Sequence, residues 1–137
     1  MTPFEAELAV NPQAISELTE RASDFLHQAG VDERTTHHVS LVLDEILTNL
    51  ISHGGSLNSS ATVRIAVEQD RVKGEIIDAG PFFDPRSTPD PDTGAAASER
   101  PIGGLGLLLV RRLTAELDYV RRGDRNHMTF SIIRQSN

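Results

Sequence analysis

Residues 39–55 read VSLVLDEILTNLISHGG, and this stretch decides the fold of the chain. Its large apolar residues recur at steps of three and four, the spacing of an α-helix that buries one face. Along the edge of that apolar stripe lie Glu45, Asn49 and His53, four residues apart. Residues at this spacing share one side of a helix. The stretch therefore predicts a helix that carries an acid and an amide at the margin of the core, although an isolated pair of this kind also occurs on ordinary half-exposed surfaces.

The sequence on either side of this helix alternates between strand and helix patterns. Period-two alternation of apolar residues predicts strands, and steps of three and four predict helices. Helices that share one face of a mixed, mostly antiparallel sheet give an α/β two-layer sandwich, an α+β fold. The length of 137 residues suits a single domain over 1–137. The predicted elements are a strand at 4–10, helices at 12–29 and 32–53, strands at 62–68 and 72–78, a helix from 103 to about 114, and a final hairpin of 117–121 and 127–133.

Composition excludes several classes of protein. The formal net charge is −7 and the basic residues form no long run, which argues against binding nucleic acid directly. The chain has no cysteine, no apolar stretch long enough to span a bilayer and no secretory signal, so we expect a cytoplasmic protein that does not bind membranes. Its one lysine, Lys73, lies in no phosphate-binding loop of the Gly-Lys-Ser/Thr type.

Two further motifs indicate where a ligand binds. Asp78 ends a predicted strand and Gly80 follows, an arrangement that also forms common turns. A carboxylate there can accept from the amino group of adenine, and the glycine lets a flat base approach the backbone. Residues 103–106, GGLG, open an apolar helix with bare N–H groups suited to phosphate. The dinucleotide-binding fingerprint is rejected, because no strand directly precedes these glycines and Leu109 replaces the third one.

The segment between these two motifs is rich in residues that interrupt regular structure. It holds a Gly-Ala run at 94–97 and five prolines. Loops of this length inside a domain are usually functional or disordered. We therefore expect a lid at about 82–102. The prolines are Pro81, Pro85, Pro89, Pro91 and Pro101.

Taken together, EILTNLISHG at 45–54, DAGPFFDP at 78–85 and GGLGLLLV at 103–110 resemble the GHKL superfamily. This superfamily includes gyrase, MutL-type ATPases and histidine kinases, which share the Bergerat ATP-binding fold. The short chain and the FDP tail at 83–85 are most similar to the anti-sigma-factor serine/threonine kinases, the bacterial switch-protein kinases. The resemblance extends over nearly the whole chain.

The resemblance implies a role for each motif. Glu45 would be the general base, and Asn49 would hold the Mg²⁺ that bridges the phosphates of ATP. Asp78 would bind adenine, with Gly80 making room for it. His53 either touches phosphate or the lid or is an ordinary helix-end residue, and Arg100 is either a γ-phosphate clamp or a solvated lid residue. Further nucleotide contacts are implied for Phe83, Gly103, Gly104, Leu105 and Gly106.

The family also implies what the protein does. The leading hypothesis is a Mg²⁺-dependent protein serine/threonine kinase that phosphorylates a small antagonist protein of STAS-like type and binds a sigma factor, with homodimer formation left open. The alternative is a non-catalytic switch that binds ATP or ADP and sequesters a regulatory partner. A third hypothesis, a catalytic domain that serves a histidine kinase in trans, is disfavoured because dimerisation and phosphoacceptor helices are missing. The intact Glu45 favours the kinase, because a pure binder needs no base.

Overall fold

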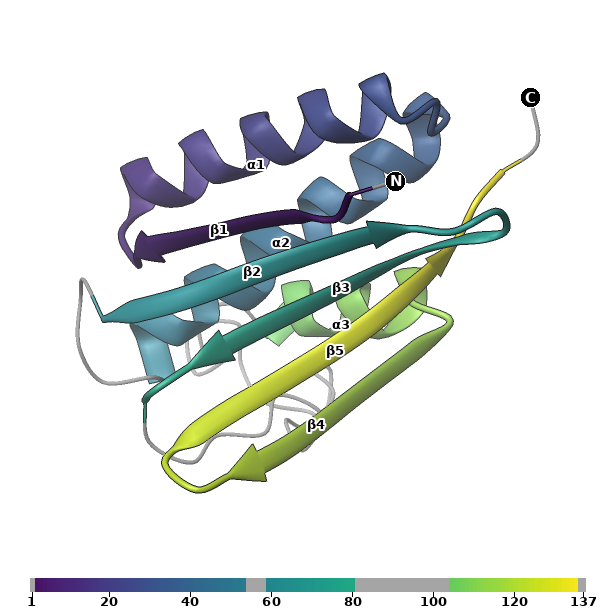
Figure 1. Cartoon of the computed structure of the whole chain (residues 1–137). Coiled ribbons are helices and arrows are strands. Elements are labelled where there is room, and N and C mark those ends of the chain that lie inside the picture. The colour runs from purple at the N-terminus through teal and green to yellow at the C-terminus, as the bar shows by residue number, and fades with distance from the viewer. Residues whose placement is uncertain (1, 54–58, 81–103, 136–137) are drawn as a thin grey trace.

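A computed structural model of the chain describes residues 2–53, 59–80 and 104–135. Its strands form a five-stranded sheet in the order β1-β2-β3-β5-β4, and the pairings between these described strands are all antiparallel. The helices lie behind the sheet in Figure 1, so one sheet face is covered and the other is open. The predicted α/β two-layer sandwich is confirmed. Its elements are β1 (Phe4–Ala9), α1 (Pro12–Gln28), α2 (Glu33–His53), β2 (Ser60–Val67), β3 (Arg71–Asp78), α3 (Gly104–Leu113), β4 (Glu116–Arg122) and β5 (Arg125–Ile133).

Polar side chains begin the two long helices. Asn11 Oδ1 accepts a hydrogen bond from the backbone N–H of Ala14 at 2.8 Å, and Pro12 occupies the first helical position. Asp32 Oδ2 accepts from the backbone N–H of Thr35 at 2.9 Å. Each contact satisfies an N–H group that the first turn of a helix leaves without an intrahelical partner. The predicted starts of both helices are confirmed.

The core lies between α2 and the covered face of the sheet. Along β3, buried and less buried residues alternate, as expected for a strand with one face against the helices. In Figure 1, α3 lies beside α2 in the same layer, and the two helices are in contact. No helix within the described ranges is long and apolar enough to cross a membrane. The buried apolar side chains of α2 are Val39, Val42, Leu43, Ile46, Leu47 and Leu50.

A glycine in the middle of the sheet makes room for an aromatic ring. Gly74 of β3 lies opposite Phe130 of β5 in the strand register, and Phe130 is buried. A Cβ atom at Gly74 would lie 2.2 Å from Cζ of that ring. This distance is far shorter than a van der Waals contact, so the ring occupies the place where any other residue would put its side chain.

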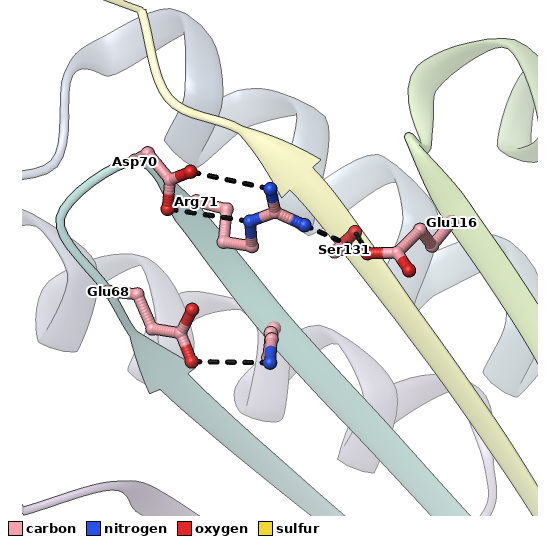
Figure 2. A network of polar contacts seen from close by, with 6 residues as sticks. Glu68, Asp70, Arg71, Glu116 and Ser131 are labelled. Atoms are coloured by element: carbon pink, nitrogen blue, oxygen red, sulfur yellow. Dashed lines mark hydrogen bonds and ion pairs between the residues drawn. The ribbon is translucent and has the colours of Figure 1, made fainter.

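The open face of the sheet carries polar and charged side chains. Figure 2 shows Arg71 between Asp70 and Glu116, with Arg71 Nη1 2.8 Å from Glu116 Oε1. Ser131 Oγ donates to the same carboxylate at 3.0 Å. A hollow of about 470 Å³ lies on this face and is lined by residues that include Lys73, Glu116 and Ser131. No described motif residue at Glu45, Asn49 or Asp78 lines it, whereas Asp78 lines a smaller hollow together with residues of α2, so the candidate site belongs to the covered face.

We predict that Gly74→Ala destabilises the protein by about 1–3 kcal/mol, the usual cost of overpacking a core. Phe130→Leu should make room for the added methyl group, so the double variant should lose less stability than the two single losses combined. Urea unfolding of the four proteins measures this coupling. A loss below about 0.5 kcal/mol for Gly74→Ala alone would show that the ring moves aside freely.

Candidate functional site

The acid and the amide of α2 form a hydrogen-bonded pair at the edge of the core. Asn49 is only 2% exposed, and Glu45 is half-buried. The side-chain nitrogen of Asn49 donates to the backbone oxygen of Glu45 at 2.7 Å and to Glu45 Oε1 at 3.3 Å. The position of the pair on the margin of the buried stripe agrees with the helical spacing of the sequence.

The amide oxygen of Asn49 is buried and has no hydrogen-bond donor within the described ranges. No described residue donates to Asn49 Oδ1. Because the amide nitrogen faces a backbone carbonyl, which only accepts, the amide cannot be reversed without putting two acceptors together. Most buried polar atoms in proteins have a partner, and an exception in a native structure needs an explanation. A bound cation or hydrogen-bond donor would satisfy this oxygen.

The environment of Glu45 favours its protonated form. Burial raises the pKa of the Glu45 carboxyl, and the negative charge of neighbouring Asp44 acts in the same direction. The hydrogen bond from Asn49 opposes both effects and lowers the pKa. The net result is a pKa above the ordinary range of a glutamate. A carboxylate of this kind is a stronger base than a glutamate in water.

Asp78 lies at the end of β3 on the covered face of the sheet. It is 6% exposed, and its Oδ2 accepts from the backbone N–H of Gly80 at 2.9 Å. Asn126 of β5 is its partner in the strand register and donates from Nδ2 to the same oxygen at 3.2 Å. One oxygen of the Asp78 carboxylate is therefore held by two donors, the backbone N–H of Gly80 and the side chain of Asn126.

Three residues that sequence reasoning missed complete this part of the site. Asn126 is 4% exposed, and its Oδ1 accepts from Tyr119 Oη at 2.5 Å and from Arg121 Nη1 at 2.9 Å. Arg121 Nη1 also donates to the backbone oxygen of Gly80 at 2.7 Å. The sequence does contain an indication for Asn126. It lies two residues before the apolar Met128 on β5, and residues two apart in a strand face the same side, here the core.

A small hollow lies between α2 and the Asp78 end of β3, and neither Glu45 nor Asn49 lines it. Its volume is about 10 Å³, room for about one water molecule, so a base that reaches Asp78 must widen it. Ile46 and Leu50, which directly follow Glu45 and Asn49, form its wall on the α2 side. The structure thus brings the α2 motif and the β3 motif to the same side of the sheet. The hollow is lined by Ile46, Leu50, Ile76, Asp78, Tyr119, Asn126 and Met128.

Several of the predicted site residues lie outside the described part of the chain. Phe83, Arg100, Gly103 and the predicted lid at 82–102 belong to this group. His53 ends α2, and Gly104 begins α3, which includes Leu105 and Gly106; the backbone of these residues is helical, and their side-chain environment is not described. The first turn of α3 carries no acidic residue that would compete for an anion at the helix N-terminus.

Comparison with known proteins identifies the class to which this fold and site belong. The model of the family described as the histidine kinase-like ATPase domain matches residues 8–132. The chain belongs to this family. Since its members are ATPases and kinases, the chain uses ATP.

Within the family, the chain is similar to bacterial protein kinases. It is 32% identical over 95 residues to the serine/threonine-protein kinase BtrW of Bordetella bronchiseptica, covering 68% of this chain and 67% of BtrW. It is 26% identical over 113 residues to the serine-protein kinase RsbW of Listeria monocytogenes, covering 78% of this chain and 72% of RsbW. The predicted membership of the GHKL superfamily, in its anti-sigma-factor-kinase-like subgroup, is confirmed, and protein kinase activity is the function in the names of both relatives.

Two solved structures show the same fold. The structure of the RsbU and RsbW domains of a Mycobacterium tuberculosis protein has a TM-score of 0.70 at 15% identity, covering 99% of this chain. This chain spans 34% of that longer protein. The SiaB–SiaC complex of Pseudomonas aeruginosa matches with a TM-score of 0.61 at 18% identity, covering 95% of this chain and 89% of the matched one.

The raised pKa of Glu45 predicts how stability depends on pH. A carboxyl whose pKa is higher in the folded than in the unfolded state stabilises the fold below its unfolded pKa, and this contribution is lost as pH rises through the folded pKa. Glu45→Gln should therefore be more stable than wild type at about pH 7, and this advantage should shrink at about pH 4, near the ordinary glutamate pKa.

Urea unfolding of both proteins at the two pH values measures this difference. In an Asp44→Asn background the pH dependence should be smaller, because the neighbouring negative charge is gone. An advantage of Glu45→Gln that is equal at both pH values, or larger in acid, would contradict the assignment.

Proposed function

We propose that this chain is a magnesium-dependent kinase that transfers the γ-phosphate of ATP to a serine or threonine of a small, STAS-like antagonist protein and also binds a sigma factor. The observation that carries the proposal is the Glu45–Asn49 pair, in which a carboxylate of raised pKa lies beside a buried amide oxygen to which no described residue donates. The similarity to the kinases BtrW and RsbW supports it. The structural neighbour from Pseudomonas aeruginosa was solved as a SiaB–SiaC complex, which supports the expectation of a protein partner.

The amide of Asn49 suits a magnesium ion. Mg²⁺ prefers oxygen ligands and is commonly held by one or two protein groups together with substrate phosphates. Asn49 offers one oxygen, and that oxygen is already turned away from the backbone of its own helix by the hydrogen bond of the amide nitrogen. When bound, the ion would neutralise negative charge on the phosphates of the nucleotide.

Glu45 is proposed as the general base. The partner hydroxyl oxygen forms a bond to the γ-phosphorus, the bond from that phosphorus to the β–γ bridging oxygen breaks, and ADP leaves with the electron pair. The proton of the hydroxyl passes to the Glu45 carboxylate. The raised pKa of Glu45 makes it a better proton acceptor than an ordinary glutamate. Positioning supplies much of the remaining acceleration in phosphoryl transfer.

The nucleotide is proposed to lie between the α2 motif and the start of α3. Asp78 would accept from the adenine amino group, and Gly80 would let the base approach the backbone. The N-terminus of α3 would face the phosphates through its free N–H groups. Contacts from His53, Phe83, Arg100 and the residues at 103–106, and closure of a lid at 82–102, remain predictions.

We predict that Asp78→Asn weakens ATP binding at least about tenfold, or about 1.4 kcal/mol. Gly80 N–H and Asn126 Nδ2 both donate to Asp78 Oδ2, so the oxygen of the substituted amide should stay there. Its NH₂ group would then face the amino group of adenine, donor against donor.

Calorimetry with ATP and Mg²⁺ measures this loss. The matched control is Asp70→Asn, which removes an exposed carboxylate from the β2–β3 hairpin and should leave affinity unchanged. Wild-type protein that binds no adenine nucleotide at millimolar concentrations would refute the proposed function as a whole.

Removal of the base should separate binding from catalysis. Glu45→Gln keeps size and hydrogen bonding but cannot take the hydroxyl proton, so it should transfer phosphate at least about a hundredfold more slowly while binding ATP within a few-fold of wild type. Asn49→Ala should lose Mg²⁺-dependent affinity as well as turnover, because it removes the proposed metal ligand.

The assay uses radiolabelled ATP with STAS-like candidate partners and scores labelled serine or threonine. Glu33→Gln, which changes an exposed acid at the far end of α2, is the control. Glu45→Gln that transfers as fast as wild type would rule out Glu45 as the base. Wild type that binds nucleotide and a sigma factor yet labels no partner would instead favour the non-catalytic switch.

A further inference from the structure

A hydrogen-bonded cluster at the end of the sheet holds the Asp78–Gly80 turn. Its members come from three strands: Asp78 from β3, Tyr119 and Arg121 from β4, and Asn126 from β5. All four side chains lie on the covered face of the sheet or at its margin, and none is fully exposed. The cluster is therefore built into the layer where the nucleotide is proposed to bind, and not into the open face.

The orientation of the Asn126 amide is fixed by the chemistry of its neighbours. On one side, Arg121 Nη1 lies 2.9 Å from Asn126 Oδ1, and a guanidinium only donates. On the other side, Asn126 Nδ2 lies 3.2 Å from Asp78 Oδ2 and 3.4 Å from the backbone oxygen of Gly80, which both accept. A reversed amide would face donor with donor and acceptor with acceptor. Asn126 is thus locked as a donor toward Asp78.

Arg121 holds three parts of the chain with one side chain. Besides Asn126, its Nη1 donates to the backbone oxygen of Gly80 at 2.7 Å, and its Nε donates to the backbone oxygen of Gly123 at 3.2 Å. The turn after β3, the amide on β5 and the β4–β5 hairpin are therefore tied to a single guanidinium. Hydrogen bonds that involve a charged donor are stronger than those between neutral groups.

These contacts leave Asp78 with one oxygen engaged and one available. Oδ2 accepts from Gly80 N–H and from Asn126, while no described residue donates to Oδ1. Around the carboxylate the hollow is otherwise mostly apolar, with Ile76 and Met128 beside it. Because one oxygen of Asp78 is held and the hollow is small, the carboxylate cannot rotate away from an unfavourable ligand group. Little water can enter between the carboxylate and that group.

We propose that Arg121 and Asn126 are positioning residues that set the selectivity of the site for 6-aminopurines over 6-oxopurines. The inference rests on the proposed binding of adenine at Asp78. A held carboxylate oxygen accepts from the 6-amino group of adenine, whereas the 6-oxo group of hypoxanthine would face it acceptor to acceptor. Sites built around one hydrogen bond reject analogues that lack it, because buried polar groups are left unpaired. Without Arg121, the turn loses its side-chain donor to the Gly80 carbonyl and the amide keeps only Tyr119 as a donor, so Asp78 is held less firmly and its carboxylate can rotate more easily.

The test compares binding of ATP and inosine triphosphate, which carries a 6-oxo group, by calorimetry in the full chain with Mg²⁺. Wild type should prefer ATP strongly, and Arg121→Met should reduce the ratio of the two affinities at least about tenfold. Arg121→Lys, which keeps the charge and one donor toward Gly80, should restore part of the ratio. The matched control is Arg122→Met, which removes the same charge from the next residue, exposed on the open face, and should leave the ratio unchanged.

Three outcomes would overturn the proposed role of Arg121. If Arg121→Met weakens both nucleotides equally and so preserves the ratio, Arg121 has only a structural role and the inference fails. Wild type that binds ATP and inosine triphosphate equally well overturns the inference while leaving ATP binding intact. Wild type that binds neither nucleotide refutes the proposed function, and this inference with it. Thermal unfolding checks that each variant is folded, and if Arg121→Met is not, Asn126→Leu carries the same comparison with the same expected loss.

Discussion

Burial of the apolar face of α2 against one side of the sheet is the interaction on which both the fold and the candidate site depend. A fully buried aliphatic side chain contributes about 1.5–3 kcal/mol, and α2 supplies six buried apolar residues. The same burial carries Asn49 into the core and leaves Glu45 at its edge. The helix that stabilises the fold therefore also holds the acid and the amide rigidly, and the cost of burying these polar groups is offset by the apolar contacts beside them.

Two buried amides give the site its polarity. The side-chain nitrogen of Asn49 donates to a carbonyl of its own helix, and its oxygen has no donor in the part of the chain that the structure describes. In Asn126 the oxygen is the satisfied atom, because it accepts hydrogen bonds from Tyr119 and Arg121. Its nitrogen donates to the carboxylate of Asp78. In both cases the neighbours allow only one orientation of the amide. The α2 side thus offers an oxygen suited to a cation, and the β3 side offers an acceptor suited to an amino group, which is the arrangement that the proposed binding of a metal-bound adenine nucleotide requires.

The site is less stable than a purely structural core would be. Burial and the charge of Asp44 hold the pKa of Glu45 above the ordinary glutamate range, which means that the ionised form is disfavoured in the fold. The buried oxygen of Asn49, which has no donor among the described residues, adds to this cost. Proteins commonly accept such local costs at functional sites, where the unsatisfied groups are those that meet the ligand. By contrast, the ion pairs of the open face, such as that of half-buried Arg71 with exposed Glu116, are in contact with solvent and contribute little.

The sequence by itself determined the local features of this protein. Periodicity set the type and approximate bounds of the helices and strands, and it placed Glu45 and Asn49 on one stripe and Asp78 at a strand end. Periodicity also indicates that Asn126 faces the core, because it lies two residues from Met128 on the same strand. Only the tertiary structure decided which strands are neighbours. The order β1-β2-β3-β5-β4 sets Asp78 opposite Asn126 and lets Arg121 reach Gly80 across 41 residues of chain. The physical reason is that alternation fixes which face a side chain takes, whereas its partner on that face depends on pairings between distant strands that no local pattern records.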